Sequence, residues 1–382
     1  MRNSGVRFAL WAGGLGLAVV LASTGTDAHK GVTSKYTYND DVYPILRERC
    51  GQCHVDNGPT PMSLLTYNDN GGAVAWAQSI REMLIAEAMP PYYADPTGPA
   101  VKNGHGITPR ELDILITWAT GGTPHGNLNR KLAPPAARPD WVLGTPDATV
   151  AIPEQQIPAG TLEASVDVTV PTSFTEAKWV RAVDLKPGTP GIVRQATVAL
   201  ADGQPLAVWE PGDDTVAAPN GTAFKVPAGA ALKVHLRYKK GWQDEQTAKT
   251  DSSSIGFYFA DEPLSGKAIE SFAVNPPAGE PPATFGSALT AGGRIVALRP
   301  MVDRPYATLD IQATTPTGRK VTLLKLRGIR PEWPRRYWLA DPVELPKGTK
   351  IDITTKAGDA EVGPLGPPVQ SPLQIALDLV TQ

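Results

Sequence analysis

Residues 165–170 read Ser165-Val166-Asp167-Val168-Thr169-Val170, and this alternation of polar and apolar residues decides the fold class. It recurs at 231–236 (Ala-Leu-Lys-Val-His-Leu) and at 350–354 (Lys-Ile-Asp-Ile-Thr), with turns rich in Pro, Gly and Asp in between. A period of two predicts half-buried β-strands, and short strands with frequent turns are typical of antiparallel sandwiches. At about 230 residues this region is large for one such domain, so we predict two, dividing near 270–281.

Composition supports a β-rich chain and excludes several classes of protein. Among 382 residues there are 38 Pro and 37 Gly, which disfavours long helical bundles. The 36 basic residues are balanced by 38 acidic ones, a net charge of −2, so no basic field exists to bind nucleic acid. Two cysteines exclude a disulfide scaffold.

The N-terminus has the pattern of a secretory signal peptide. Arg2 and Arg7 precede an apolar run over 8–22, and small residues follow up to Ala28, after which we expect cleavage. The mature protein would then lie in the periplasm. The apolar run is about 15 residues, shorter than the roughly 20 that span a bilayer, and an uncleaved inner-membrane anchor is the alternative. We expect no transmembrane span in the mature chain.

Between the signal peptide and the β-region the sequence predicts helices, at about 41–49, 73–88 and from Thr108 onward. Thr108-Pro109-Arg110-Glu111 has the pattern of a capping box, and Gly121-Gly122 ends that helix. We therefore predict a multidomain chain with the following parts: a signal peptide at 1–28, a small all-α domain at 29–130, a Pro-rich linker at 131–152, and two tandem antiparallel β-sandwiches at 153–270 and 271–382.

Cys50-Gly51-Gln52-Cys53-His54 is a C-x-x-C-H sequence, the pattern of covalent c-type haem attachment. The two thiols add to the two vinyl groups of one haem, and His54 becomes an axial ligand of the iron. A redox dithiol would require a βαβ setting, and a structural zinc site would require two further Cys or His ligands. Neither is present, so we predict one covalent haem c held by Cys50, Cys53 and His54.

The sixth iron ligand is less constrained by the sequence. Met89 is the leading candidate, because it follows a predicted helix and two prolines hold the next residues extended. A His/Met pair leaves no open position for O₂ and raises the reduction potential, which suits electron transfer. The other candidates are Met62, Met83, His105 and His125, and an open sixth position is the remaining alternative.

These residues resemble a family of small bacterial monohaem cytochromes c. The resemblance is carried by Tyr43-Pro44-Ile45-Leu46, the C-x-x-C-H motif, Met89-Pro90-Pro91 and the segment from Thr108 to Trp118. It implies that Met89 is the axial ligand.

The rest of the chain resembles the copper type II ascorbate-dependent monooxygenase module, which is similar to peptidylglycine hydroxylating monooxygenase. The landmarks are Pro171-Thr172-Ser173-Phe174, Leu232 to Tyr238, Ser254-Ile255-Gly256-Phe257, Ala297-Leu298-Arg299-Pro300, Trp333 to Tyr337 and Leu345 to Thr349.

The copper ligands implied by that second resemblance are missing. The expected His-His pair reads Arg194-Gln195, the expected His-x-His reads Met301-Val302-Asp303, and the stretch 374–378 has no Met. Only His235 stands where a copper histidine would be. Copper requires several imidazole or sulfur ligands that converge, so we expect no copper.

The sequence thus predicts a periplasmic carrier of single electrons whose β-region is a docking or scaffold module for an unidentified redox partner protein. An electron-transfer role is favoured over an enzymatic one. The alternatives are a haem-fed monooxygenase that retains a metal near His235, and a haem-based sensor with an open sixth position. Four arginines (Arg327, Arg330, Arg335, Arg336) are interpreted as a solvated face or, less favoured, a patch that docks an acidic partner.

Overall fold

The computed structural model describes residues 33–381 except 57, 61, 103, 105, 136–137, 263–265 and 359–370. The predicted signal peptide at 1–28 lies outside the described residues. The described residues are mostly β, with 38% of them in strands and 11% in helices. The helical segments are η1 (Tyr38–Val42, a π-helical turn), α2 (Tyr43–Arg49), α3 (Ala77–Ile85), α4 (Pro109–Thr120) and η2 (Trp242–Asp244, a 3₁₀ turn).

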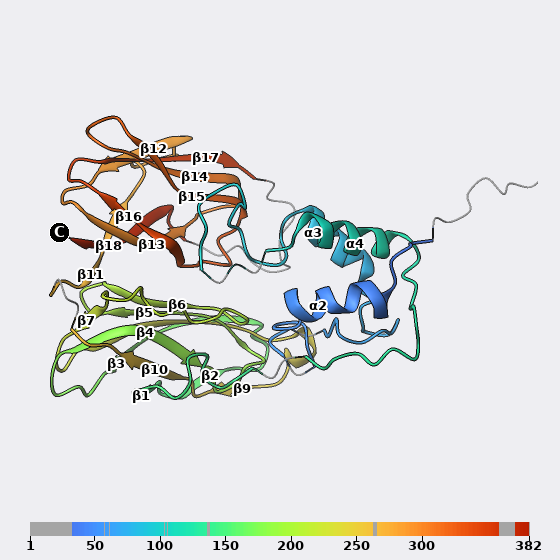
Figure 1. Ribbon diagram of the computed structural model, residues 1–382. Coiled ribbons are helices and arrows are strands. Elements are labelled where there is room, and N and C mark those ends of the chain that lie inside the picture. Colours follow the sequence, from blue (N-terminus) through green and yellow to red (C-terminus); the bar gives the residue numbers. More distant parts are fainter. Residues whose placement is uncertain are drawn as a thin grey trace, which may run out of the picture.

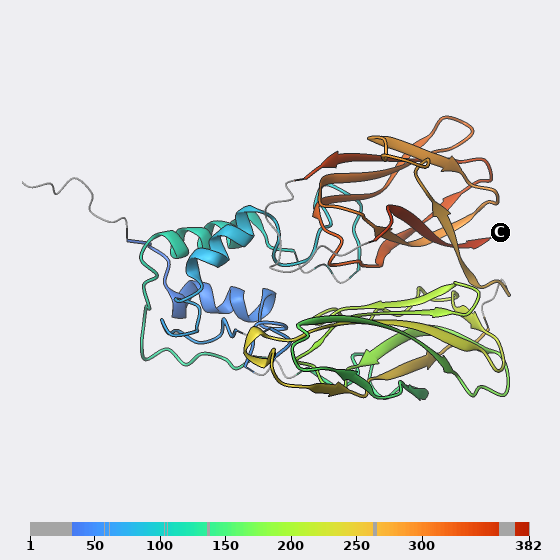
Figure 2. The ribbon, with the colours of Figure 1, turned by 180° about the vertical axis from the view of Figure 1, so that it is seen from behind.

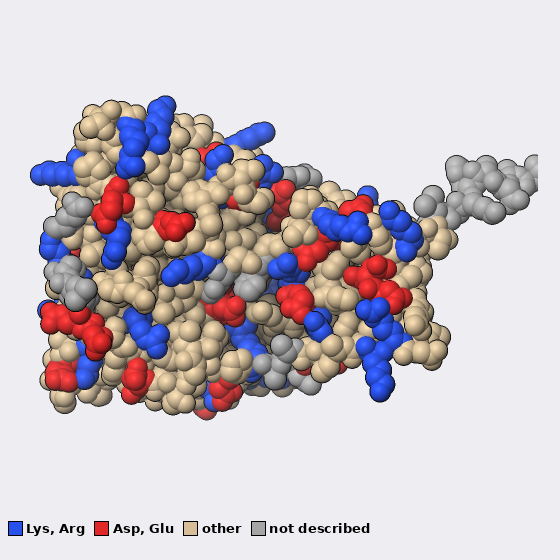
Figure 3. Space-filling model, in the orientation of Figure 1, with Lys and Arg blue, Asp and Glu red and all other residues tan. Residues whose placement is uncertain are grey.

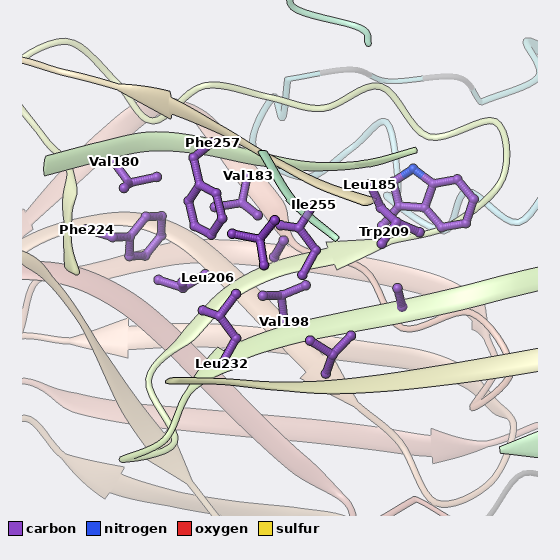
Figure 4. Packing of buried hydrophobic residues seen from close by; sticks show 14 of the residues in the cluster. Val180, Val183, Leu185, Val198, Leu206, Trp209, Phe224, Leu232, Ile255 and Phe257 are labelled. Carbon is purple, nitrogen blue, oxygen red and sulfur yellow. The ribbon is translucent and has the colours of Figure 1, made fainter. Parts of the chain in front are cut away.

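Two four-stranded antiparallel sheets, which we call the first sheet pair, enclose one hydrophobic core (Figure 1). Figure 4 shows this core, with Val180 and Phe224 at one end and Trp209 at the other. One sheet contains β1 (Ala148–Ala151), β10 (Ser254–Phe259), β4 (Lys178–Lys186) and β7 (Phe224–Val226). The other contains β3 (Glu163–Pro171), β8 (Ala231–Lys239), β5 (Val193–Leu200) and β6 (Pro205–Trp209). A short ribbon of β2 (Gln155–Ile157) and β9 (Lys249–Asp251) accompanies them.

Two further four-stranded sheets form the second sheet pair around a second core. One contains β11 (Ile269–Val274), β18 (Gln374–Thr381), β13 (Gly293–Met301) and β16 (Tyr337–Leu345). The other contains β12 (Thr284–Ala288), β17 (Lys350–Ala357), β14 (Tyr306–Thr314) and β15 (Lys320–Ile329). The predicted strands at 165–170, 231–236 and 350–354 are confirmed as parts of β3, β8 and β17.

The two sheet pairs share a continuous interior, because the sheet that holds β13 and β18 is buried on both faces. In β13, Val296 and Ala297 belong to the first core, whereas Ile295 and Leu298 belong to the second. The four central residues of this strand, 295–298 (Ile-Val-Ala-Leu), are accordingly an apolar run without alternation. Within this buried sheet, Asp378 of β18 lies between two arginines: Arg299 Nε is 3.5 Å from Oδ1, and Arg336 Nε is 2.9 Å from Oδ2.

The N-terminal region, residues 33–147, has a small core of its own around Tyr38, Leu46, Leu115 and Trp118. The capping box is confirmed: Thr108 accepts from the Glu111 amide, and Glu111 accepts from the Thr108 amide. Of the other two predicted helices, the one at 41–49 is found as η1 and α2, which together cover 38–49, whereas α3 covers only 77–85 of the predicted 73–88.

The expected fold class was wrong. No small all-α cytochrome domain is present among the described residues, where three short α-helices are joined by long irregular segments. The reason is long-range pairing: Ala94 bridges to Leu326 of β15, and Val101 bridges to Leu339 of β16. Tyr93 packs in the second core. The predicted domain boundaries stay predictions, and no described helix is long and apolar enough to cross a membrane.

Candidate functional site

The C-x-x-C-H segment lies on a tight turn at the end of α2. The Cys50 amide donates to Leu46 O, and the amides of Cys53 and His54 both donate to Cys50 O, at 3.0 and 2.8 Å. Gly51 is required by this turn, because a Cβ there would meet the Arg47 carbonyl oxygen at 2.6 Å. The backbone thus gathers both thiols and the imidazole on one turn of chain.

The turn abuts the first sheet pair, toward which α2 points in both views (Figure 1, Figure 2). The Cys53 thiol donates to the carbonyl of Pro211, 3.3 Å away, in the loop after β6. Gly212 in that loop has φ +82°, and a Cβ at this position would meet Cys53 Sγ at 2.7 Å. A glycine is therefore needed at 212 both for the backbone conformation and for the close approach of the sulfur.

Both cysteines are free thiols. Burial raises the pKa of Cys50 to about 12, and burial also raises the pKa of Cys53 to about 11. At neutral pH both thiols are therefore protonated, and neither is a thiolate that could bind a metal.

The His54 ring is oriented through its Nδ1 atom, which is 3.3 Å from Thr60 Oγ1. That hydroxyl lies 3.0 Å from Cys53 O and 3.1 Å from Met62 O. In the tautomer in which Oγ1 donates its one hydrogen to a carbonyl and accepts from Nδ1–H, the Nε2 lone pair is left for a metal. Burial lowers the pKa of His54 to about 4. A hydrogen bond to the Met62 backbone acts in the opposite direction but is the smaller effect. The ring is neutral near pH 7.

These residues fit a covalently attached haem. Two free thiols three positions apart and a neutral imidazole with an available Nε2 are the donor set that such a group requires. Zinc fits less well, because no group of three or more His, Cys, Asp or Glu side chains gathers within the described parts of 33–381.

Met89 lies where α3 gives way to the segment that joins the second sheet pair. Its amide donates to Met83 O at 3.3 Å, and two residues after Met89-Pro90 the Tyr92 amide donates to Pro90 O. The contacts described for this segment do not link Met89 to His54, so its role as ligand stays a prediction.

The other candidates for the sixth position are differently engaged. His125 stacks on Tyr67, with ring centroids 3.7 Å apart and an interplanar angle of 8°. Met83 lies in α3, and the Met62 carbonyl accepts from Thr60. His105 lies outside the described residues.

Charged residues from three distant segments surround Cys53, and sequence reasoning missed most of them. Arg138 of the Pro-rich segment donates to Gln52 Oε1 and to the Asp213 carbonyl. Arg335 Nη1 donates to Asp213 Oδ1 at 2.9 Å, and its Nη2 is 3.5 Å from the buried Glu210. Burial raises the pKa of Glu210 well above its ordinary value, although Arg335 opposes this. No local sequence signal marks such a cluster, because its members are joined only by folding.

The four arginines at 327–336 do not form the solvated or docking face expected. Arg330, Arg335 and Arg336 are buried, and Arg327 donates to Asp95 Oδ2 of the N-terminal region at 2.5 Å. Arg327, Arg335 and Arg336 join parts of the chain to one another.

The positions of the missing copper ligands are occupied by other interactions. Arg194 donates to the carbonyls of Val193 and Gly191, and burial lowers its pKa to about 10. His235 Nδ1 is 2.9 Å from Asp167 Oδ1 on the neighbouring strand. Asp378, in the stretch that lacks the methionine, forms the buried ion pairs described above.

Comparisons with known proteins give no family. No protein-family model matches the chain, and no curated protein matches its sequence. The solved structures that it resembles include the major capsid protein P2 of bacteriophage PM2, at 10% identity and a TM-score of 0.25, covering 60% of this chain and 97% of that one. A second is the Sulfolobus turreted icosahedral virus structure, at 10% identity and a TM-score of 0.15, covering 67% and 99%. Likenesses this weak carry no argument about function.

Proposed function

We propose that this chain carries one covalent haem c on Cys50 and Cys53, and that it passes single electrons to and from a redox partner protein in the periplasm. His54 and Met89 are the proposed axial ligands. The observation that carries the proposal is the turn at 50–54, which brings two free thiols and an imidazole with an available Nε2 together. The resemblance of the surrounding motifs to monohaem cytochromes c supports it.

Each residue of the turn has a distinct task in this proposal. Cys50 and Cys53 supply the sulfurs of two thioether bonds. Thr60 holds the imidazole of His54 in the tautomer that ligates through Nε2. A haem with His and Met ligands supplies a one-electron couple and leaves no open position for a substrate.

The β-region is proposed as the scaffold that fixes the orientation of this turn. The Pro211 carbonyl accepts from Cys53, and Arg138 ties Gln52 to Asp213. Lys and Arg are interspersed with Asp and Glu over the face shown in Figure 3. Since neither positive nor negative charge predominates on that face, recognition of a partner there would rest on complementary shape and on individual pairs of opposite charge.

Visible spectra of the periplasmically matured protein, oxidised and reduced, test the axial ligands. We expect a low-spin haem with the weak far-red band of methionine–ferric ligation, and loss of that band in Met89→Ala. Met83→Ala is the matched control, because Met83 is also half-buried and lies six residues away in α3; the band should persist in it. A band unaffected by Met89→Ala would contradict the ligand assignment.

Two further readouts on the same sample separate the alternatives. Carbon monoxide binding to the ferrous protein at neutral pH would favour a sensor with an open sixth position, whereas a His/Met haem should not bind it. About one copper per chain would favour a haem-fed enzyme that uses His235, and we expect none.

A further inference from the structure

Glu210 is a buried carboxyl group beside the haem turn. It begins the loop after β6, and its neighbour Pro211 accepts from the Cys53 thiol at 3.3 Å. Glu210 is 1% exposed, and neither of its carboxylate oxygens has a hydrogen-bond partner among the described residues. Burial without hydrogen bonds disfavours the ionised form of a carboxyl group, because the lost hydration is not replaced.

Arg335 offsets the charge of Glu210 only in part. Its Nη2 atom is 3.5 Å from Glu210 Oε2, whereas its Nη1 atom donates to Asp213 Oδ1 at 2.9 Å. Two carboxyl groups therefore compete for one guanidinium, and Asp213 lies closer to it. Burial raises the pKa of Glu210 well above its ordinary value, Arg335 opposes this, and Asp213 raises the pKa further. A change of one unit of charge nearby then alters the protonation of Glu210.

The other titratable and charged groups that face Glu210 keep their charge near neutral pH. Arg237 of β8 lowers the pKa of Glu210, but its Nη2 atom is also 3.4 Å from Glu163. Tyr93, in the segment after α3, and Tyr337, at the start of β16, also act on Glu210, and burial raises the pKa of both phenols. Phenols and guanidinium groups titrate far above carboxyl groups. Among these groups, Glu210 is the one whose charge can change.

A small pocket connects this cluster to solvent. Its lining includes Asp213, Arg335 and Tyr337, which all interact electrostatically with Glu210. The space open to the centres of water molecules is about 50 Å³, and part of the pocket opens to the outside. Roughly 10–15 Å³ of such space is enough for one water molecule, so the pocket has room for several. Protons can therefore reach the groups that surround Glu210.

We propose that Glu210 takes up a proton from solvent when the haem on Cys50 and Cys53 is reduced, and releases it when the haem is oxidised. The inference rests on the proposed function, because it requires a redox centre at Cys53. The electron comes from the redox partner protein, the proton comes from water, and the O–H bond of Glu210 is the bond that forms. The added electron and the added proton cancel, so the net charge of the buried site does not change.

The direction of the resulting pH dependence follows from the charges. An added negative charge near Glu210 raises its pKa, so the reduced protein binds a proton over a pH range in which the oxidised protein does not. Within that range reduction consumes a proton, and the reduction potential falls as pH rises. The steepest slope is a tenfold change in the equilibrium constant for reduction per pH unit, or about 59 mV for a one-electron couple.

Potentiometric titration of the full-length, periplasmically matured protein tests this coupling. The range from about pH 5 to about pH 9 covers the pKa values documented for buried glutamates. We expect the potential to fall with rising pH in the unmodified protein and to stay nearly constant in Glu210→Gln. This variant should fold, because it keeps the shape of the side chain and removes a buried charge.

Glu332→Gln is the matched control. Glu332 also has a buried carboxylate oxygen without a hydrogen-bond partner in the described chain, but it follows β15 and acts on Tyr93. It is not part of the loop that contacts Cys53. The pH dependence of the potential in Glu332→Gln should therefore equal that of the unmodified protein.

Infrared difference spectra, reduced minus oxidised, identify the group that takes up the proton. We expect the carbonyl band of a protonated carboxyl group to appear on reduction, to be absent in Glu210→Gln and to persist in Glu332→Gln. The inference would be overturned by a potential that does not vary with pH, by an equal pH dependence in Glu210→Gln, or by no such band in the unmodified protein. The proposed function would survive each of these results. A matured protein without covalent haem would contradict the proposed function, and this inference with it.

Discussion

The N-terminal region and the β-region of this chain differ in where they place reactive side chains. Both cysteines, four of the five histidines and four of the five methionines precede residue 131, whereas the β-region has one His, one Met and no Cys. In the β-region, arginines and acidic residues form buried ion pairs instead, such as those around Asp378. Ligand chemistry is thus concentrated in the part with the least regular backbone.

The irregular N-terminal region is held in one conformation by its contacts with the β-region. The N-terminal region has only a small core, and contacts with the β-region anchor it, among them Cys53 on Pro211, Asp95 on Arg327, and Val101 paired with Leu339. Rigid sheets supply the order that a turn with few local contacts lacks. Three substitutions compare the stability contributed by the sheet interior, by the contact between the two regions, and by the N-terminal region itself.

The largest effect is expected in the sheet interior, from Asp378→Ala. This change leaves Arg299 and Arg336 buried without their carboxylate, and we expect a loss of about 3–5 kcal/mol in unfolding free energy. Guanidinium denaturation of the full-length protein measures it. Asp352→Ala is the control, because its partner Lys350 is largely exposed, and it should cost under about 0.5 kcal/mol. Equal losses in the two variants would show that the buried sheet does not carry the stability.

A smaller, pH-dependent effect is expected where the two regions meet. Burial raises the pKa of Asp95, but hydrogen bonds from Thr97 and Arg327 outweigh burial and hold that pKa below its ordinary value. Asp95→Asn should therefore lower the unfolding free energy by about 1–2 kcal/mol at neutral pH. The ion pair with Arg327 should contribute little of this loss, because the Arg327 side chain is exposed.

The direction of the pH dependence follows from the lowered pKa. The stabilisation by Asp95 is fully present above the pKa of the unfolded carboxyl, about 4, and is lost as pH falls through the lower folded pKa. Denaturation curves of Asp95→Asn and the unmodified protein should converge below that range. A difference that stayed constant down to pH 2 would show that ionisation of Asp95 is not involved.

The smallest effect is expected within the N-terminal region itself. Thr108→Ala removes the acceptor of the capping box at the start of α4, and we expect a loss of about 1 kcal/mol. Thr120→Ala in the last turn of α4 is the control, because that hydroxyl only donates to the Ile116 carbonyl of its own helix. Hydrogen exchange of the α4 amides measures both. Equal exchange rates in the two variants would contradict a specific role for the cap.

Local patterns in the sequence predicted local features of the structure. The capping box at 108–111 and the strands at 165–170, 231–236 and 350–354 needed only their own residues. The fold class was missed because it depends on contacts between distant segments. The two bridges to Leu326 and Leu339, and the burial of β13 on both faces, have no counterpart in short-range periodicity.

The candidate site likewise contains residues that the sequence identified and residues that it did not. Cys50, Cys53 and His54 were identified from their spacing, because one turn of chain holds them together. Thr60 was missed, since it reaches His54 across a loop, and so was Glu210, which is 156 positions or more from the motif. Arg335 and Arg336 were misread as surface residues, because their acidic partners lie in distant segments, Asp213 in the loop after β6 and Asp378 in β18.

Covalent attachment of one haem to Cys50 and Cys53 can be measured as the intact mass of the denatured, periplasmically matured protein. We expect the mass of the mature chain plus one haem. The haem mass should be retained after acid-acetone extraction and should be absent from the Cys50→Ala/Cys53→Ala double variant. A chain of unmodified mass in cells that mature other c-type cytochromes normally would contradict it.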